Sequence, residues 1–396
     1  MKHIQCDTNS NDSIHVCVLA SWYPSEENPV AGIFIKEQVK AISQFAQVSV
    51  IAVQQGNSAR GLEYSDEDGV LTARAIIAQS FMGKIPRFDL IRKMQIEAFD
   101  YIVQNNGTPD IVHVQALWPA ALGACILKKK YGIPFIVTEH SEEYLPSTEL
   151  KLIKRRGMLA GVIRPLASNA SAYIAVSDTL AQRLKDLKIA ANSYIIPNVV
   201  SIPTLAAQAK EKKSVVKILH ISQLSPAKNI PLLLQAVAEL SKRRNDFSLT
   251  IVGGSNFKEY ELQASALGIS KQYIEFTGVV PPEQTDSYYS NSDFSVLSST
   301  HETFSTFAAQ SLAWGLPVVS TKSGGPESFI NNQVGRLVEN GSVDALTAGL
   351  SWMIDNHSTF SPEKLSAYAR AKFSSEVVGD QIQKVYNQCT IKKGKL

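Results

Sequence analysis

The segment from residue 301 to 327 contains the pattern of a helix followed by a buried strand. Residues 304–314 are mostly good helix formers, and apolar side chains recur there at helical spacing. Gly315 is placed to end this helix, and Pro317 prevents its continuation. Residues 316–320 are apolar and β-branched, as in a short buried strand. The order helix, glycine, proline, strand is typical of α/β proteins, so the segment predicts that fold class.

The start of this helix has the features of an anion site. Ser305 or Thr306 can cap the first turn, and Glu302 comes just before it. A second glycine-rich turn follows at residues 323–326. Free backbone N–H groups and the positive end of the helix dipole favour phosphate at such a corner. Gln310 follows Glu302 by eight residues, which is about 12 Å along a helix and matches the length of a pyrophosphate with a sugar and a ribose at its ends.

These residues resemble the signature of family 4 of the retaining glycosyltransferases. Members of that family use nucleotide sugars and have the GT-B fold, an α/β fold in which two Rossmann-like domains face each other across a cleft. The signature is a glutamate, seven residues, a second glutamate, a Pro-Val-Val strand and a Gly-Gly turn. Here Glu302 and Gln310 take the first two positions, so one carboxylate is an amide, and residues 316–319 and 324–328 follow in the same order. Ordinary packing would also explain this segment alone, so positions elsewhere must support the resemblance.

Length and composition limit the alternatives. With 396 residues, 44% of them hydrophobic and 19% charged, the chain can form two or three globular domains. A net charge of +3 gives no support for nucleic-acid binding. Four cysteines lie far apart without a CxxC pair, which favours reduced thiols. No apolar run is long enough for a membrane span and the N-terminus is polar, so we expect a cytoplasmic protein.

Short apolar runs alternate with helical segments through the first half, as in a parallel sheet covered on both faces. Strands are predicted at residues 14–20, 48–53, 110–114, 135–140, 172–177 and 193–198. Residues 74–87 have a mixed composition and give no clear prediction. We therefore place a first domain at residues 1–198, a polar linker at 199–214 and a second domain at 215–372. The resemblance implies that the first domain is on the acceptor side and that the second binds the donor. The resemblance adds a last helix, at about residues 373–390, that crosses back to the first domain.

Two residues of the first domain are candidates for the site. Gly32 precedes a helix in the first strand-to-helix loop, and His140 ends a predicted strand. Ligands of open parallel sheets bind beyond the carboxyl ends of the strands, which favours His140 as a site residue. In the family, the matching glycine faces the donor diphosphate and the matching histidine lies near the transferred sugar. A plain turn explains Gly32 equally well, and packing is the better explanation for His113, which ends an earlier strand.

A lysine in the second domain lies where a phosphate ligand is expected. Lys228 follows a strand and enters a helix, which is a good place for a phosphate-binding lysine. The family has an arginine five residues before this lysine, and both grip the donor phosphates. Gln223 replaces that arginine here, so a permanent charge and a bidentate fork are lost. An exposed lysine without a ligand is the simpler alternative.

The resemblance assigns the remaining donor contacts. Gly254 ends a strand and lets the backbone approach a ligand, and the backbone near Val279 would meet the nucleobase. The N–H groups from Phe304 to Thr306 would hold the phosphates, and the Glu302 carboxylate would bind sugar hydroxyls. Gln310 would reach the ribose, since its amide oxygen can still accept from hydroxyl groups. We expect this to weaken donor binding without abolishing it.

Basic residues cluster in the first half and raise the question of membrane contact. The clusters are Lys128, Lys129 and Lys130, and then Lys151, Lys154, Arg155 and Arg156. Acidic residues are interleaved with them, so a solvated helix face is the better explanation. Peripheral contact with anionic lipids at the inner membrane face, beside a membrane-held acceptor, is the sharper alternative.

The sequence as a whole predicts a hexosyltransferase of surface polysaccharide or lipopolysaccharide synthesis, acting on a glycan or lipid-linked acceptor. His140 and Glu302 are the predicted catalytic residues. No His/Cys cluster of metal-ligand spacing occurs, so neither a metal nor a cofactor is expected. Two other classes stay open: a different GT-B enzyme, such as a nucleotide-sugar epimerase or a phosphorylase, and a non-catalytic partner subunit. A decayed donor site could explain Gln223 and Gln310, although Glu302 and Lys228 are both present.

Overall fold

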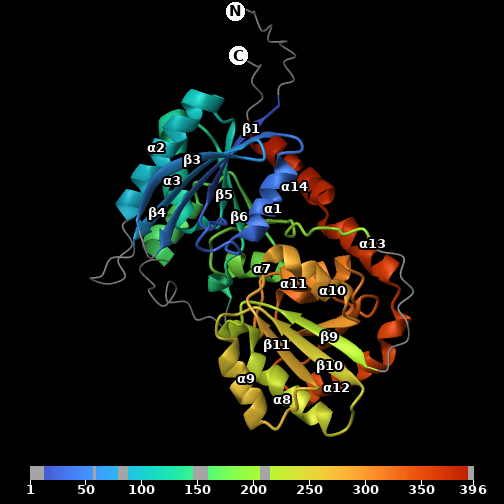
Figure 1. Cartoon of the computed structure of the whole chain (residues 1–396). Coiled ribbons are helices and arrows are strands. Elements are labelled where there is room, and N and C mark those ends of the chain that lie inside the picture. The colour runs from blue at the N-terminus through green and yellow to red at the C-terminus, as the bar shows by residue number, and fades with distance from the viewer. Residues whose placement is uncertain (1–12, 57–58, 79–87, 146–158, 206–214, 391–396) are drawn as a thin grey trace, which may run out of the picture.

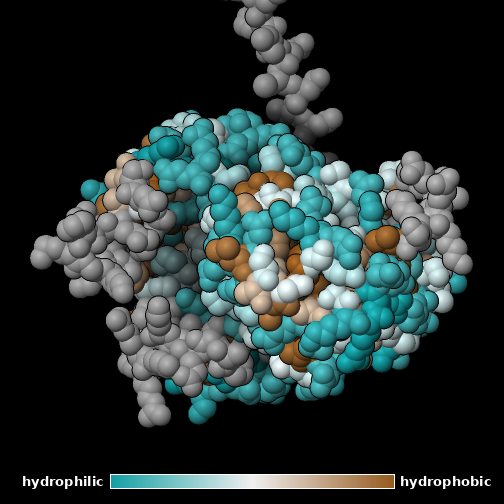
Figure 2. All heavy atoms as spheres, turned by 60° about the horizontal axis from the view of Figure 1, so that its bottom comes forward, coloured by the Kyte–Doolittle hydropathy of each residue, from teal (hydrophilic) through white to brown (hydrophobic). Residues whose placement is uncertain are grey.

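The computed structural model describes residues 13–56, 59–78, 88–145, 159–205 and 215–390. Two α/β domains, each built around its own largely parallel sheet, lie one above the other in Figure 1. This arrangement confirms the predicted fold class. Apolar side chains fill the space between sheets and helices, and the surface seen in Figure 2 is largely hydrophilic, with hydrophobic side chains in small groups.

The first sheet has the order β3-β4-β2-β1-β5-β6-β7-β8, and only β3 runs antiparallel to its neighbour. Its strands are β1 (His15–Ala20), β2 (Gln47–Gly56), β3 (Arg60–Glu67), β4 (Val70–Ala78), β5 (Ile111–Gln115), β6 (Phe135–Glu139), β7 (Ala172–Ala175) and β8 (Tyr194–Ile195). The helices of this domain include α1 (Ile33–Ile42), α2 (Phe88–Asn106), α3 (Leu117–Tyr131), α6 (Arg164–Ala167) and α7 (Asp178–Asp186). All residues of β1, β5 and β6 are buried, as expected for strands covered on both faces.

The second sheet has the order β11-β10-β9-β12-β13-β14 and is parallel throughout. Its strands are β9 (Val216–Ile221), β10 (Phe247–Val252), β11 (Ile274–Gly278), β12 (Phe294–Leu297), β13 (Val318–Thr321) and β14 (Gly335–Val338). The helices are α8 (Ile230–Ser241), α9 (Phe257–Ala266), α10 (Thr285–Ser290), α11 (Thr306–Ala313), α12 (Val343–Asn356) and α13 (Pro362–Phe373). Helix α8 contributes eight buried residues to the core of this domain.

Both sheets follow the same doubly wound topology. If the hairpin strand β3 is set aside, the first six strands of each domain lie in the order 3-2-1-4-5-6 along the sheet. Sheets of this order bind ligands beyond the carboxyl ends of the central strands, where the order reverses. In this protein those ends are the loops after β1 and β5 in the first domain, and after β9 and β12 in the second.

The last helix, α14 (Ser375–Cys389), returns to the first domain and packs beside α1 (Figure 1). Val378 and Ile382 join the same core cluster as Ile35 and Val39 of α1. The approach is close, because a Cβ added to Gly379 would lie 3.2 Å from the carbonyl oxygen of Ala41. Helix α14 is thus part of the first domain's core.

Several predicted elements differ from those observed. The helix predicted at residues 304–314 begins only at Thr306, and the strand predicted at 193–198 is reduced to the two residues of β8. Strand β4 lies partly in the segment that gave no clear prediction, and its hairpin partner β3 was not predicted. Most residues of β3 are exposed or partly exposed, so it lacks the apolar pattern by which the other strands were recognised.

Candidate functional site

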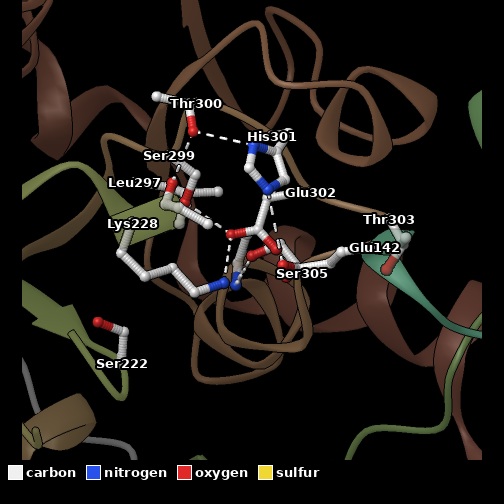
Figure 3. Close-up of polar contacts among 12 residues, drawn as sticks. Glu142, Ser222, Lys228, Leu297, Ser299, Thr300, His301, Glu302, Thr303 and Ser305 are labelled. Carbon is white, nitrogen blue, oxygen red and sulfur yellow. Dashed lines mark hydrogen bonds and ion pairs between the residues drawn. The ribbon is translucent and has the colours of Figure 1, made fainter. Parts of the chain in front are cut away.

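The predicted phosphate ligand Lys228 is held by the buried acid Glu302 (Figure 3). Lys228 ends a 3-10 turn (Pro226–Lys228) after β9, and its Nζ lies 2.7 Å from Glu302 Oε1. The Ser299 hydroxyl donates to the same oxygen over 2.6 Å. The Glu302 side chain is only 5% exposed. Two loops of the second domain therefore meet at one buried ion pair.

The charge of Lys228 is stabilised against its burial. Burial lowers the pKa of this ammonium group, but Glu302 and then Glu142 raise it, so that the pKa lies above its ordinary value. The lysine stays protonated at neutral pH, as a phosphate ligand must. A bound anion would share this lysine with the two carboxylates.

Glu302 lies in an extended segment that ends before helix α11 begins. It forms an isolated bridge with Gly324, in which Glu302 N donates to Ser323 O and Gly325 N donates to Glu302 O. The predicted separation of about 12 Å from Gln310 assumed an unbroken helix, and that geometry is wrong. The glycine-rich turn does lie beside the start of the helix, as the sequence suggested.

Helix α11 starts beside the Glu302 segment with a capped first turn. Ser305 has a left-handed backbone, with φ of 75°, and its Oγ accepts from Ala308 N over 3.4 Å. The prediction that Ser305 or Thr306 caps this helix is confirmed for Ser305. Phe304 is 2% exposed, and its ring packs against Phe329 and Phe373. Only the backbone of Phe304 can therefore serve a ligand, and that contact stays a prediction.

Gln310 makes a contact that the sequence did not indicate. Its Nε2 donates to the carbonyl oxygen of Ser201 over 2.7 Å, in the segment that leaves β8. The amide thus joins helix α11 to the connection between the domains. Its predicted contact with a ribose would use the remaining oxygen.

His140 lies at the carboxyl end of β6, where the sequence placed it, and is 5% exposed. Its Nε2 is 2.7 Å from Gln115 Oε1, and the ring lies 4.7 Å from that of Phe34. Burial lowers the pKa of His140 to about 3, partly opposed by the side chain of Asn198. The imidazole is therefore neutral at physiological pH.

Contacts between the domains place His140 next to the Glu302 loop. The Thr303 hydroxyl donates to the carbonyl oxygen of His140 over 3.0 Å. Thr179, at the start of α7, donates to Gly324 O over 3.1 Å. The structure therefore brings the two predicted catalytic residues together from separate domains.

The predicted glycine contacts have structural explanations of their own. Gly32 has a φ of 67°, and a Cβ there would lie 2.6 Å from the carbonyl oxygen of Trp22. Gly254 has a φ of 71°, and its Cβ would lie 2.4 Å from the Leu224 side chain. Both positions need glycine for the fold of their loops. Gln223 and Val279 are exposed, Val279 by 69%. The donor contacts predicted for these four residues stay predictions.

Sequence reasoning missed an acid of the first domain and a histidine of the second that lie close together. Glu142, in the 3-10 turn Glu142–Tyr144 after β6, has Oε2 at 3.7 Å from His301 Nε2 (Figure 3). Burial and Glu302 raise the pKa of Glu142, while Lys228 and His301 act against them. The position of this acid directly after a central strand was the available signal. Glu327, in the glycine-rich turn of the signature, accepts from the N–H groups of Ser323 and Gly324.

The site can bind a ligand that is anionic at one end and rich in hydroxyl groups at the other. Lys228 and the start of α11 offer positive charge and donors. Glu302 and Glu142 offer carboxylate acceptors within the same corner, and neutral His140 closes it from the first domain. A sugar attached to a phosphate has this combination of groups.

Comparison with known proteins identifies the class. Residues 31–202 match the family model described as Glycosyltransferase Family 4, and residues 201–372 match the one described as Glycosyl transferases group 1. The fold matches that of sucrose-phosphate synthase from Thermosynechococcus elongatus, with a TM-score of 0.75 and 18% identity over 95% of this chain and 98% of that one. These matches define a GT-B glycosyltransferase fold. The chain belongs to family 4 of the glycosyltransferases.

Two curated relatives illustrate the range of the family. The alpha-monoglucosyldiacylglycerol synthase of Streptococcus pneumoniae is 28% identical over 57% of this chain and 54% of its own length. The putative teichuronic acid biosynthesis glycosyltransferase TuaC of Bacillus subtilis is 23% identical over 84% of this chain and 87% of its own. The match to the pneumococcal protein thus spans about half of that relative. Within the described residues, no helix is long and apolar enough to cross a membrane.

Proposed function

We propose that the protein transfers a hexose-type sugar from a nucleoside diphosphate donor to a hydroxyl group of a glycan or lipid-linked acceptor, with retention of configuration. The observation that carries this proposal is the Lys228–Glu302 pair beside the start of α11, in a loop that is hydrogen-bonded to His140 of the first domain. Relatives support the acceptor class, because one is named for a glucosyl lipid and another for teichuronic acid synthesis. A structural neighbour, Anabaena HepE, was solved with UDP and glucose.

The reaction exchanges one carbon–oxygen bond for another. The acceptor oxygen bonds to the anomeric carbon on the face from which the diphosphate departs, and the bond to the diphosphate oxygen breaks. The acceptor proton passes to the leaving phosphate oxygen, so the products are a glycoside and a nucleoside diphosphate. Lys228 and the N–H groups of α11 would stabilise the charge on the leaving group, with dipoles fixed before the reaction begins.

The remaining side chains would orient the sugar. Glu302 would accept hydrogen bonds from its hydroxyl groups, and Gln310 would accept from the ribose. Neutral His140 would contact the sugar from the first domain. Because Gln223 replaces an arginine, Lys228 would supply much of the side-chain charge at the phosphates.

A place at the inner membrane face, in the cytoplasm, suits a lipid-linked acceptor, and we extend the proposal to it. Of the two basic clusters, the second (Lys151, Lys154, Arg155 and Arg156) lies outside the described residues. In the first cluster, Lys128 donates to the carbonyl oxygen of Asn169, and Lys130 pairs with Asp100. Binding to anionic vesicles, compared with neutral vesicles, would test this part.

The donor site is tested by thermal shift with UDP-, GDP- and ADP-sugars. We expect one nucleotide class to raise the melting temperature of the wild-type protein and to have little effect on Lys228→Ala. Lys242→Ala is the matched control, because Lys242 is an exposed lysine that pairs with Glu239 at the end of α8. It should keep the shift. A shift that survives in Lys228→Ala would contradict the assignment of Lys228.

Product analysis separates transfer from the alternatives. Incubation of the donor with candidate acceptors should release the nucleoside diphosphate and form a glycoside. Conversion of the sugar without an acceptor would instead identify an epimerase. Donor binding without turnover, across the acceptors tried, would favour the non-catalytic partner subunit.

A further inference from the structure

We propose that Gln115 is a positioning residue that holds His140 as a neutral imidazole with its proton on Nε2, so that the Nδ1 lone pair is the acceptor atom of this side chain. The proposal rests on the proposed function where it places His140 at the reacting sugar. It adds a residue that the sequence motifs did not indicate.

The amide of Gln115 is oriented by its neighbours. Gln115 ends β5 beside Thr138 of β6 and is fully buried. Its Nε2 donates to Gln38 Oε1 over 2.6 Å and lies 3.4 Å from His113 Nε2, so the NH2 group points toward Gln38 and His113. The oxygen is thereby directed at His140, 2.7 Å from Nε2.

This orientation fixes the position of the histidine proton. A carbonyl oxygen has no hydrogen to give, so His140 Nε2 must donate in this contact. Since burial keeps the imidazole neutral, the single ring proton is on Nε2 and Nδ1 carries the lone pair. The tautomer of a histidine is commonly set in this way by the partner of one ring nitrogen.

A second layer of contacts supports Gln115. His113 Nε2 lies 2.7 Å from Thr138 Oγ1, and His113 Nδ1 lies 2.6 Å from the Tyr386 hydroxyl. Tyr386 belongs to α14 and is fully buried. If His113 Nδ1 donates to Tyr386, its Nε2 is free to accept from both Thr138 and Gln115, which leaves each of these contacts with one donor and one acceptor. The network thus runs from the last helix of the chain to His140.

The tautomer can be read directly by NMR. Protein labelled with 15N-histidine would be compared with His140→Gln to assign the His140 signals in long-range 1H–15N spectra. We expect the wild-type protein, without donor or acceptor, to show His140 protonated on Nε2. Protonation on Nδ1 in the wild-type protein would overturn the proposal, whatever the variants do.

Gln115→Leu removes the hydrogen bond with little change in volume. We expect His140 to lose its single tautomer and kcat to fall by about 10- to 100-fold, the usual effect of a small misplacement. The KM for the donor should stay within about twofold, because Lys228 and Glu302 are unchanged. Gln115→Glu, which keeps an oxygen for Nε2, should retain the Nε2 tautomer and recover part of kcat.

The control removes a comparable bond elsewhere in the sheet. Ser49→Ala breaks the buried contact between Ser49 Oγ and His15 Nε2, which is 3.1 Å long. It should lower the melting temperature without changing the His140 signals or kcat. An unchanged His140 tautomer in folded Gln115→Leu would overturn the proposal. Because the spectra need no substrate, a failure to find transferase activity would count only against the proposed function.

Discussion

At the scale of single residues, burial keeps His220 neutral at acidic pH values where a histidine in solution would be protonated. It is fully buried in β9, with Nδ1 2.9 Å from the Val296 carbonyl and Nε2 2.8 Å from the Ser222 hydroxyl. The carbonyl must accept, so Nδ1 carries the proton and Nε2 accepts from Ser222. Burial lowers the pKa of His220 to about 4, partly opposed by the Val296 carbonyl. The folded protein therefore holds this side chain neutral across most of the acidic range.

This burial makes stability depend on pH. Between pH 6.5 and 4, the unfolded chain binds a proton at His220 that the folded chain does not, so stability is lost as the pH falls. From pH 7 to pH 5 the loss due to His220 should be about 2 kcal/mol. Urea unfolding at both pH values should show that His220→Asn reduces the wild-type loss by this amount.

An equal loss in the wild-type protein and in His220→Asn would contradict this prediction. Burial raises the pKa of Glu139 to about 7, so this residue acts in the opposite direction. Since Glu139 is present in both proteins, its effect cancels in the comparison.

The sequence could place the candidate site residues at the ends of strands, but it could not predict which of them contact each other across the two domains. Lys228, Glu302 and His140 each follow a strand, and strand ends can be located from apolar runs. The meeting of Glu142 with His301 depends on how the two domains face each other, which spacing within one domain does not specify. The hydrogen bond of Gln310 to Ser201 depends on the same relation.

At the scale of single elements, α11 begins two residues later than predicted because of the loop that precedes it. The apolar pattern predicts a start at residue 304, but the bridge of Glu302 with Gly324 keeps the preceding chain extended. The left-handed backbone of Ser305 then turns the chain into the helix at Thr306. Propensity cannot reveal this, because the bridge joins residues 22 positions apart. Strand β3 was not predicted for a related reason: it is exposed, and its extended structure depends on its pairing with β4.

Two substitutions at Ser305 distinguish the stability due to its capping hydrogen bond from the cost of its left-handed backbone. Ser305→Ala loses the bond to Ala308 N and keeps a side chain in the left-handed region, so it should cost about 1–2 kcal/mol. Ser305→Gly loses the same bond but relieves the backbone, so its cost should be only a few tenths of a kcal/mol. Chemical denaturation of both variants checks the order, and equal costs would show that strain plays no part.

At the scale of the whole molecule, the first domain is incomplete without the C-terminal end of the chain. Helix α14 packs on α1, and the Tyr386 hydroxyl of α14 is hydrogen-bonded to His113 of β5. The sequence suggested this crossing only through the family resemblance, because an amphipathic helix does not indicate which surface it covers. The core that surrounds β1 therefore combines residues from both ends of the chain.

Gly379 tests the packing of α14. Gly379→Val places a branched side chain against the Ala41 carbonyl, at a contact of 3.2 Å or less, and should lower the free energy of unfolding by about 1–3 kcal/mol. Asp380→Val introduces the same residue at the next position, which is exposed, and is the control. Thermal unfolding of the two variants checks the prediction. Equal losses would show that the close approach does not limit the packing.

The two passages of the chain between the domains lie side by side. Val200 N, on the outgoing passage, donates to the carbonyl oxygen of Phe373, on the returning one, over 3.0 Å. The Phe373 ring also packs against Phe304 at the start of α11. Because these two passages are adjacent, we expect the two domains to rotate about the line along which they lie. The displacement should be smallest at Phe304 and largest at the parts of the domains farthest from it. A ligand bound near this axis would then stay in place while a second substrate enters where the domains separate.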